Sequence, residues 1–132
     1  MSQKLSRLML AVAALLLASA TALGAIASHA LDGALTPDAL ASFATAVDYQ
    51  FFHSLGLIAI AIHAERHPQA RSLLVAALAL LAGIVLFCGG VYTSSLDGPG
   101  WIANLAPVGG ISLMMGWVIV AIGAVWSFIR DD

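Results

Sequence analysis

Long apolar runs alternate with short polar segments along the whole chain. Four runs carry almost no charged side chain, and they lie near residues 8–27, 46–64, 72–92 and 108–129. Each has about 20 residues, which as an α-helix would cross a hydrocarbon core of roughly 30 Å. The connecting segments are short. The pattern therefore predicts an all-α fold, an integral membrane four-helix bundle with up-down topology, in one transmembrane domain covering residues 1–132.

The second helix has a clear predicted start. Thr36 is a favoured N-cap residue, and the following Pro37 suits the first helical position. No helix-breaking residue follows until Gly56, so one helix is expected to continue to about Ala64. Such a helix would be about 42 Å long, which exceeds the hydrocarbon core. We therefore expect its first turns, residues 37–45, to lie in the membrane interface.

Three connectors separate the predicted spans. Residues 28–37 form a loop with a turn at Asp32-Gly33, and residues 65–71 form a charged connector. Residues 93–107 are rich in turn residues, and Trp101 there is expected to anchor the chain at the membrane interface.

Positive charges are confined to one side of the predicted topology. All the lysines and arginines fall at the N-terminus, in the second connector or at the C-terminus: Lys4, Arg7, Arg66, Arg71 and Arg130. The positive-inside rule therefore predicts a multi-pass protein of the cell (inner) membrane with both termini in the cytoplasm. A cleaved signal peptide is the alternative for the first run, but that run is longer than a usual signal core, and we expect an uncleaved first span.

The composition fits a chain surrounded by lipid. Hydrophobic residues make up 61% and charged residues 9%, far below the roughly 25% charged residues of soluble domains. No basic patch exists to hold a phosphate backbone, so no nucleic-acid partner is expected. Cys88 is the single cysteine, which excludes an intrachain disulfide and a cysteine cluster. No nucleophile–base spacing, phosphate loop or pair of catalytic carboxylates is present, so we expect no enzymatic activity, no catalytic residue, no metal and no cofactor.

Small residues recur every seven positions on three of the spans. They are Ala11, Ala18 and Ala25; Ala76, Gly83 and Gly90; and Gly109, Gly116 and Gly123. Lipid provides no hydrophobic force between helices, so close backbone approach at small residues holds membrane helices together. The spacing predicts helix-packing seams, through which the protein would form a homo-oligomer or join a larger membrane complex.

Polar residues interrupt the start of the second span. On a helix, Tyr49 and His53 are one turn apart, and Gln50 shares their broad face. The topology brings further polar groups to the same outer half of the bundle, and the candidate polar cluster is His29, Asp32, Asp48, Tyr49, Gln50, His53 and Tyr92. Polar groups inside a bilayer are costly, so they are candidates for function.

Three hypotheses remain for the two outer histidines, His29 and His53. The leading one is structural: the imidazoles hydrogen-bond Asp32, Asp48 or loop carbonyls and tie the outer loop to the bundle. The second is a proton or small-solute pathway, which would make the chain a transporter or channel subunit. The third is ligation of haem or a metal by facing imidazoles, which would make it a redox subunit.

Several motifs in order resemble one known family. They are Gly24-Ala25-x-x-Ser28-His29-Ala30-Leu31, Ala46-Val47-x-Tyr49-Gln50-x-x-His53-x-Leu55, Gly90-x-Tyr92, Ala106-Pro107-Val108-Gly109-Gly110 and Gly116-Trp117. With these, nearly the whole chain resembles the domain of unknown function 423 family, small inner-membrane proteins whose animal relative is called transmembrane protein 256. The resemblance implies four spans and an unassigned biochemical function. Where family members often read Ser-Gly-Ser-Leu-Tyr, this chain has Cys88-Gly89-Gly90-Val91-Tyr92, which argues against a hydroxyl-lined role there.

Overall fold

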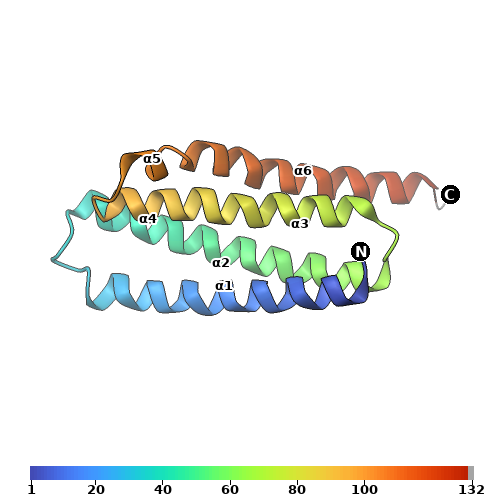
Figure 1. The fold of residues 1–132 in the computed structure, drawn as a ribbon, viewed down its shortest axis with the longest axis horizontal. Helices are drawn as coiled ribbons and strands as arrows, with labels where there is room; N and C mark the ends of the chain where they lie inside the picture. Colours follow the sequence, from blue (N-terminus) through green and yellow to red (C-terminus); the bar gives the residue numbers. More distant parts are fainter. Residues whose placement is uncertain (131–132) are drawn as a thin grey trace.

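The computed structural model describes residues 1–130, which form four long helical segments in up-down order (Figure 1). The elements are α1 (Gln3–His29), α2 (Pro37–Arg66), α3 (Arg71–Gly83), the π-helical turn η1 (Ile84–Cys88), α4 (Gly89–Ser95), the short α5 (Gly100–Ala103) and α6 (Ala106–Arg130). α3, η1 and α4 follow one another without a break and together make the third span. The four long segments are apolar enough to cross a membrane, and the predicted all-α membrane bundle is confirmed.

The second helix begins where its capping residues predict. The Thr36 side-chain oxygen accepts a hydrogen bond from the Ala39 backbone N–H at 3.3 Å, and Pro37 occupies the first turn. α1 starts in the same way, because the Ser2 hydroxyl accepts from the Leu5 N–H. The interfacial position of residues 37–45 remains a prediction.

The predicted loop over residues 93–107 is shorter than expected. α4 continues to Ser95 and ends at a turn in which the Gly98 N–H bonds the Thr93 carbonyl at 2.8 Å. Asp97 takes the left-handed backbone conformation that this turn requires (φ 53°). The short helix α5 then carries Trp101, which is 69% exposed. The turn residues mark the ends of the helices correctly, but helical hydrogen bonds extend into the segment from both sides.

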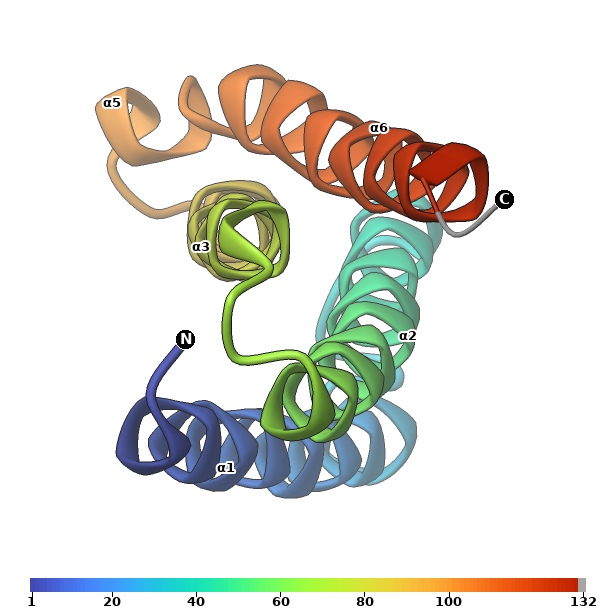
Figure 2. The same ribbon diagram turned by 90° about the vertical axis from the view of Figure 1, so that its right-hand side faces the viewer.

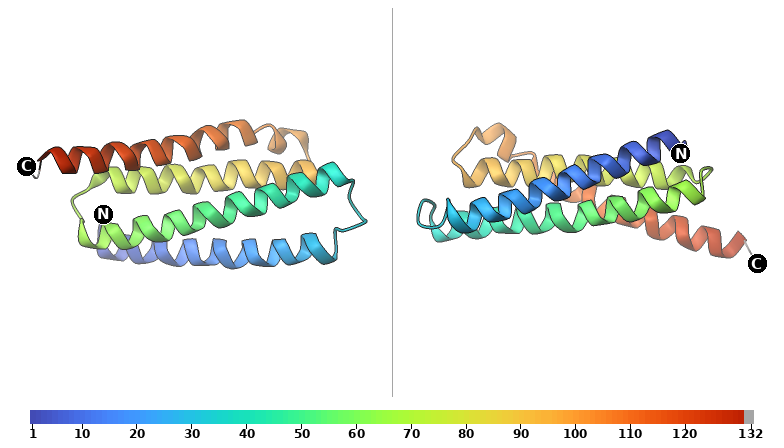
Figure 3. Two further views of the ribbon diagram at one scale, coloured as in Figure 1. Left: turned by 180° about the vertical axis from the view of Figure 1, so that it is seen from behind. Right: turned by 90° about the horizontal axis from the view of Figure 1, so that it is seen from below.

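α2 and the α3–η1–α4 segment occupy the middle of the molecule (Figures 1 and 2). α1 packs against α2, and α6 packs on the opposite side against α3 and η1. The N-terminus, the α2–α3 connector and the end of α6 lie at one end of the bundle, whereas the α1–α2 loop and α5 lie at the other (Figure 3, left). α1 and α6 therefore present broad outer faces.

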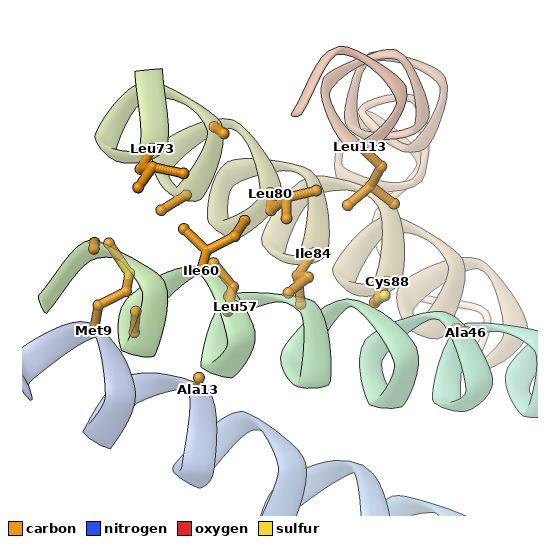
Figure 4. Packing of buried hydrophobic residues seen from close by; sticks show 14 residues of the cluster. Met9, Ala13, Ala46, Leu57, Ile60, Leu73, Leu80, Ile84, Cys88 and Leu113 are labelled. Atoms are coloured by element: carbon orange, nitrogen blue, oxygen red, sulfur yellow. The ribbon is translucent and has the colours of Figure 1, made fainter. Parts of the chain in front are cut away.

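The core lies between the middle helices. Leu57 and Ile60 of α2 point toward Leu80 and Leu73 of α3, and Leu113 reaches in from α6 (Figure 4). Ala76 is fully buried in the same core. The core thus contains a few large buried side chains, and the helix backbones come close to one another where the side chains are small.

Glycines let α6 approach the third span very closely. A Cβ atom on Gly109 would lie 2.7 Å from the Phe87 Cα and closer still to the Phe87 backbone nitrogen. A Cβ on Gly83 would lie 2.9 Å from the Leu113 backbone nitrogen, and a Cβ on Gly90 would lie 3.0 Å from the Ala106 backbone nitrogen. A Cβ on Gly116 would lie 2.7 Å from the Leu80 side chain, and a Cβ on Gly123 would lie 3.0 Å from the Ser72 hydroxyl. The glycines of both segments are therefore used inside the chain.

The predicted seam of α1 does not pack against the other helices of this chain, and its use in packing against another chain stays a prediction. Ala11, Ala18 and Ala25 are exposed, and the side of α1 that packs inward presents Ser6, Ala13, Ala20 and Ala27. Both sets repeat every seven residues, so the spacing defines a stripe of small residues but does not tell which stripe faces α2.

Candidate functional site

Gln50 is the centre of the polar contacts inside the bundle. Its side chain is only 4% exposed. The Gln50 Nε2 donates to the Leu16 carbonyl oxygen at 2.9 Å and to the Ser19 hydroxyl at 2.7 Å, both on α1. The Tyr92 hydroxyl of α4 donates to the Gln50 Oε1 at 2.9 Å. One amide thus joins α1, α2 and α4, and we call Ser19, Gln50 and Tyr92 the Gln50 cluster.

The surroundings of the Gln50 cluster leave its polar atoms well partnered. The buried Ser54 hydroxyl donates to the Gln50 backbone carbonyl at 2.6 Å. The Ser19 hydroxyl donates in turn to the Leu16 carbonyl at 2.9 Å. The Tyr92 ring packs on Phe43, with centroids 4.7 Å apart. Since both the donor and the acceptor side of the Gln50 amide are occupied by protein, the cluster is built to connect helices.

A row of rings lies beside this cluster on the outer surface of α2. Tyr49 stacks on His53 with a centroid distance of 5.6 Å and also contacts Phe87 at 4.9 Å. His53 lies 6.2 Å from the ring of Trp117 on α6. Gly56 makes room for that indole, because a Cβ there would lie 2.6 Å from two of its carbons. We call Phe87, Tyr49, His53 and Trp117 the aromatic row; it joins α2 to η1 and α6.

The structure brings together only part of the predicted polar cluster. Gln50 and Tyr92 are joined by a hydrogen bond between their side chains. Tyr49 and His53 stack on each other on the outer surface of α2. The side chains of His29, Asp32 and Asp48 are exposed. None of these three makes a side-chain hydrogen bond within residues 1–130.

The predicted hydrogen bonds from His53 to the outer loop are wrong. The His53 Nδ1 lies 2.7 Å from the Tyr49 carbonyl oxygen, one turn back on its own helix. This partner lies on the same helix, whereas Asp32 lies in the α1–α2 loop beyond the helix end. Within the described chain, no group of three or more His, Cys, Asp or Glu side chains is placed to hold a metal ion.

Sequence reasoning missed two contributors, Ser19 and Trp117. Ser19 interrupts the apolar run of α1, and that isolated hydroxyl was the available signal. Trp117 stood in a recognised motif, but its contact with Gly56 depends on the packing of α6. The π-helical turn η1 had no signal at all; its wider turn changes the direction in which α4 presents Tyr92 relative to a regular helix.

Comparisons with known proteins agree with the membrane fold. The family described as "Protein of unknown function (DUF423)" matches residues 23–110, which include Gln50 and Tyr92. The UPF0382 membrane protein YwdK of Bacillus subtilis is 32% identical over 106 residues, covering 80% of this chain and 86% of that protein. A UPF0382 membrane protein of Haemophilus influenzae is 34% identical over 103 residues, with 78% and 82% coverage. The UPF0382 inner membrane protein YgdD of Escherichia coli strain K12 is 32% identical over 120 residues, or 91% of each chain. No solved structure matches this chain.

Proposed function

We propose a role for this chain from the premise that it belongs to the DUF423 family, a membrane-protein family of unknown function. The chain acts without catalysis, as a small membrane subunit that self-associates through the lipid-facing side of α1. Its partner in this association is a second copy of the chain.

The observation that carries this proposal is the exposed small-residue stripe of α1. Ala11, Ala18 and Ala25 repeat every seven residues and face away from the bundle. Small residues on a lipid-exposed helix allow another helix to approach closely, which is the main source of attraction between helices in lipid. The tightest glycines of α3, α4 and α6 already hold α6 in place within the chain. A self-complementary stripe on one helix suits a two-fold dimer, because the same surface serves both copies.

The Gln50 cluster supports a role without catalysis or transport. Its amide and hydroxyl groups bond one another across three helices. Polar groups that are already satisfied by protein have less capacity to exchange protons or to bind a passing solute. The cluster therefore serves the fold, and the outer face of α1 serves association.

Replacing Ala18 by isoleucine tests the proposal. We expect the Ala18→Ile protein to dimerise about tenfold more weakly, equivalent to about 1.4 kcal/mol, because the larger side chain keeps the two α1 helices apart. Energy transfer between differently labelled copies in proteoliposomes, measured over a range of protein-to-lipid ratios, would give the association constant.

Ala121→Ile is the matched control for this substitution. Ala121 is an exposed alanine on α6, so the same added side chain meets lipid and not the proposed seam. Its association should equal that of the unmodified protein. Equal association of the Ala18→Ile and unmodified proteins would refute a seam on α1.

We also propose that both termini are cytoplasmic, on the strength of the positive charges. Arg66 and Arg71 flank the α2–α3 connector, at the same end of the bundle as the N-terminus (Figure 1). An Arg66→Cys protein that also carries Cys88→Ser should resist a membrane-impermeant thiol reagent applied to intact cells and react after lysis. Labelling of intact cells would reverse the orientation.

A further inference from the structure

A cavity of about 770 Å³ opens at the end of the bundle that holds the N-terminus. It lies between the α2–α3 connector and the last turns of α6. Arg66, His67 and Gln69 line it on the connector side. A smaller cavity of about 300 Å³ adjoins it and shares five of its lining residues, which are His67, Ala70, Ser72, Gly123 and Ser127. The larger volume is in the range of sites that hold small-molecule or lipid ligands.

The two walls of the larger cavity differ in chemistry. The connector wall is basic and polar, whereas Ile119, Ile122 and Trp126 make the α6 wall apolar. Within residues 1–130 no carboxylate lines the cavity. Glu65, the nearest acid in sequence, is directed toward Arg7, with 3.7 Å between its Oε1 and the Arg7 Nε. The site is thus suited to a molecule with one anionic and one apolar end.

The basic wall is held in place by contacts across the end of the bundle. The amino group of Met1 donates a hydrogen bond to the Pro68 carbonyl. The His67 N–H bonds the His63 carbonyl at 3.2 Å, and the two imidazoles stack with centroids 4.3 Å apart. The connector is therefore a formed wall facing α6.

The cavity lies near the ends of three membrane-spanning segments, where a lipid headgroup is expected. Trp126 is 64% exposed, and an indole near the end of a membrane span is typical of the interface between headgroups and acyl chains. Basic residues close to a span end attract anionic headgroups. Ser72 and Ser127 add hydroxyls to the lining.

We propose that this cavity binds an anionic phospholipid from the adjoining leaflet. The phosphate lies beside Arg66 and His67, where the hydroxyls of Ser72 and Ser127 can donate to its oxygens. An acyl chain runs along Ile119, Ile122 and Trp126. None of the residues that line the cavity belongs to α1, so the inference stands independently of self-association.

Binding of two lipids with identical chains tests this site. Purified full-length protein would be mixed with equal amounts of phosphatidylglycerol and phosphatidylcholine in detergent, and the bound lipids counted by native mass spectrometry. Phosphatidylglycerol should be retained preferentially. Arg66→Gln should weaken its binding about fivefold, the change that corresponds to about 1 kcal/mol for one basic residue near an anionic headgroup.

Two further variants make the result specific. Arg7→Gln removes a charge at the same end of the bundle but outside the cavity, and its lipid preference should match that of the unmodified protein. Ser127→Leu keeps the charge and fills part of the cavity, so it should also reduce retention. Equal retention of the two lipids, or an unchanged preference in Arg66→Gln, would overturn the proposal. Displacement of the lipid by millimolar inorganic phosphate would also overturn it, because the site would then belong to a soluble anion.

Discussion

Gly109→Ala is expected to lower the free energy of unfolding by about 3 kcal/mol, the upper part of the usual range for overpacking. The added Cβ would lie 2.7 Å from the Phe87 Cα and closer still to the Phe87 backbone nitrogen. These are backbone atoms of η1, so no side-chain rotation can relieve the clash. α6 must move away from the third span, which weakens the neighbouring contact of Gly116 with Leu80 as well.

The adjacent glycine supplies the control. A Cβ on Gly110 would meet only the Phe87 ring, at an ordinary contact distance of 3.6 Å. Gly110→Ala makes the same chemical change on the same helix, and we expect its stability to equal that of the unmodified protein or to exceed it by up to about 1 kcal/mol, because alanine favours the helix more than glycine does. Reversible unfolding in mixed micelles would measure both variants. Equal stability of the two would show that α6 does not approach η1 as closely as described.

Gln50→Leu is expected to cost about 2 kcal/mol of stability. Leucine has a similar volume, but it removes the three hydrogen bonds of the Gln50 amide and leaves the part-buried Tyr92 hydroxyl without its acceptor. Tyr92→Phe should cost about 1 kcal/mol, because it removes one hydrogen bond and keeps the ring against Phe43. Single interhelical hydrogen bonds in membranes average about 0.6 kcal/mol, so the Gln50 effect arises from several lost together.

The double variant distinguishes one connected cluster from two separate sites. The double variant Gln50→Leu with Tyr92→Phe should lose about 1 kcal/mol less stability than the sum of the losses of the two single variants. Each single variant already removes the hydrogen bond between the two side chains, and the double variant can lose that bond only once. Thr45→Val is the control: the Thr45 hydroxyl bonds only the Ala41 carbonyl of its own helix, so its loss should leave stability unchanged. Strict additivity of the Gln50 and Tyr92 effects would contradict the cluster.

The helices were predictable because their signals are local. The length of each apolar run indicates a span, and Thr36 with Pro37 marks a helix start through contacts within a few residues. The placement of Gln50 and Tyr92 in the same half of the bundle also followed from up-down topology. Their direct hydrogen bond required the rotation of α4 about its axis, which η1 alters without any recognisable residue pattern.

The faces of α1 were not predictable from spacing. Ala11, Ala18 and Ala25 and the inward set that includes Ala13 and Ala20 have the same period, and both are small and apolar. What selects the inward face is contact with α2, including the bonds from Gln50 to Leu16 and Ser19. The up-down topology also put His29 in the same half of the bundle as the polar residues of α2, but its side chain is exposed, because the rotation of α1 about its axis decides which residues face α2.

The most direct test measures association and unfolding on the same two variants, Ala18→Ile and Gln50→Leu, in the same lipid. Ala18→Ile should lose about tenfold in association while its unfolding free energy changes by less than about 0.5 kcal/mol, because Ala18 faces away from the bundle. Gln50→Leu should lose stability while its folded fraction still associates through α1. Undiminished association of the Ala18→Ile protein, together with loss of association in a folded Gln50→Leu protein, would contradict the division of roles between the outer face of α1 and the polar interior.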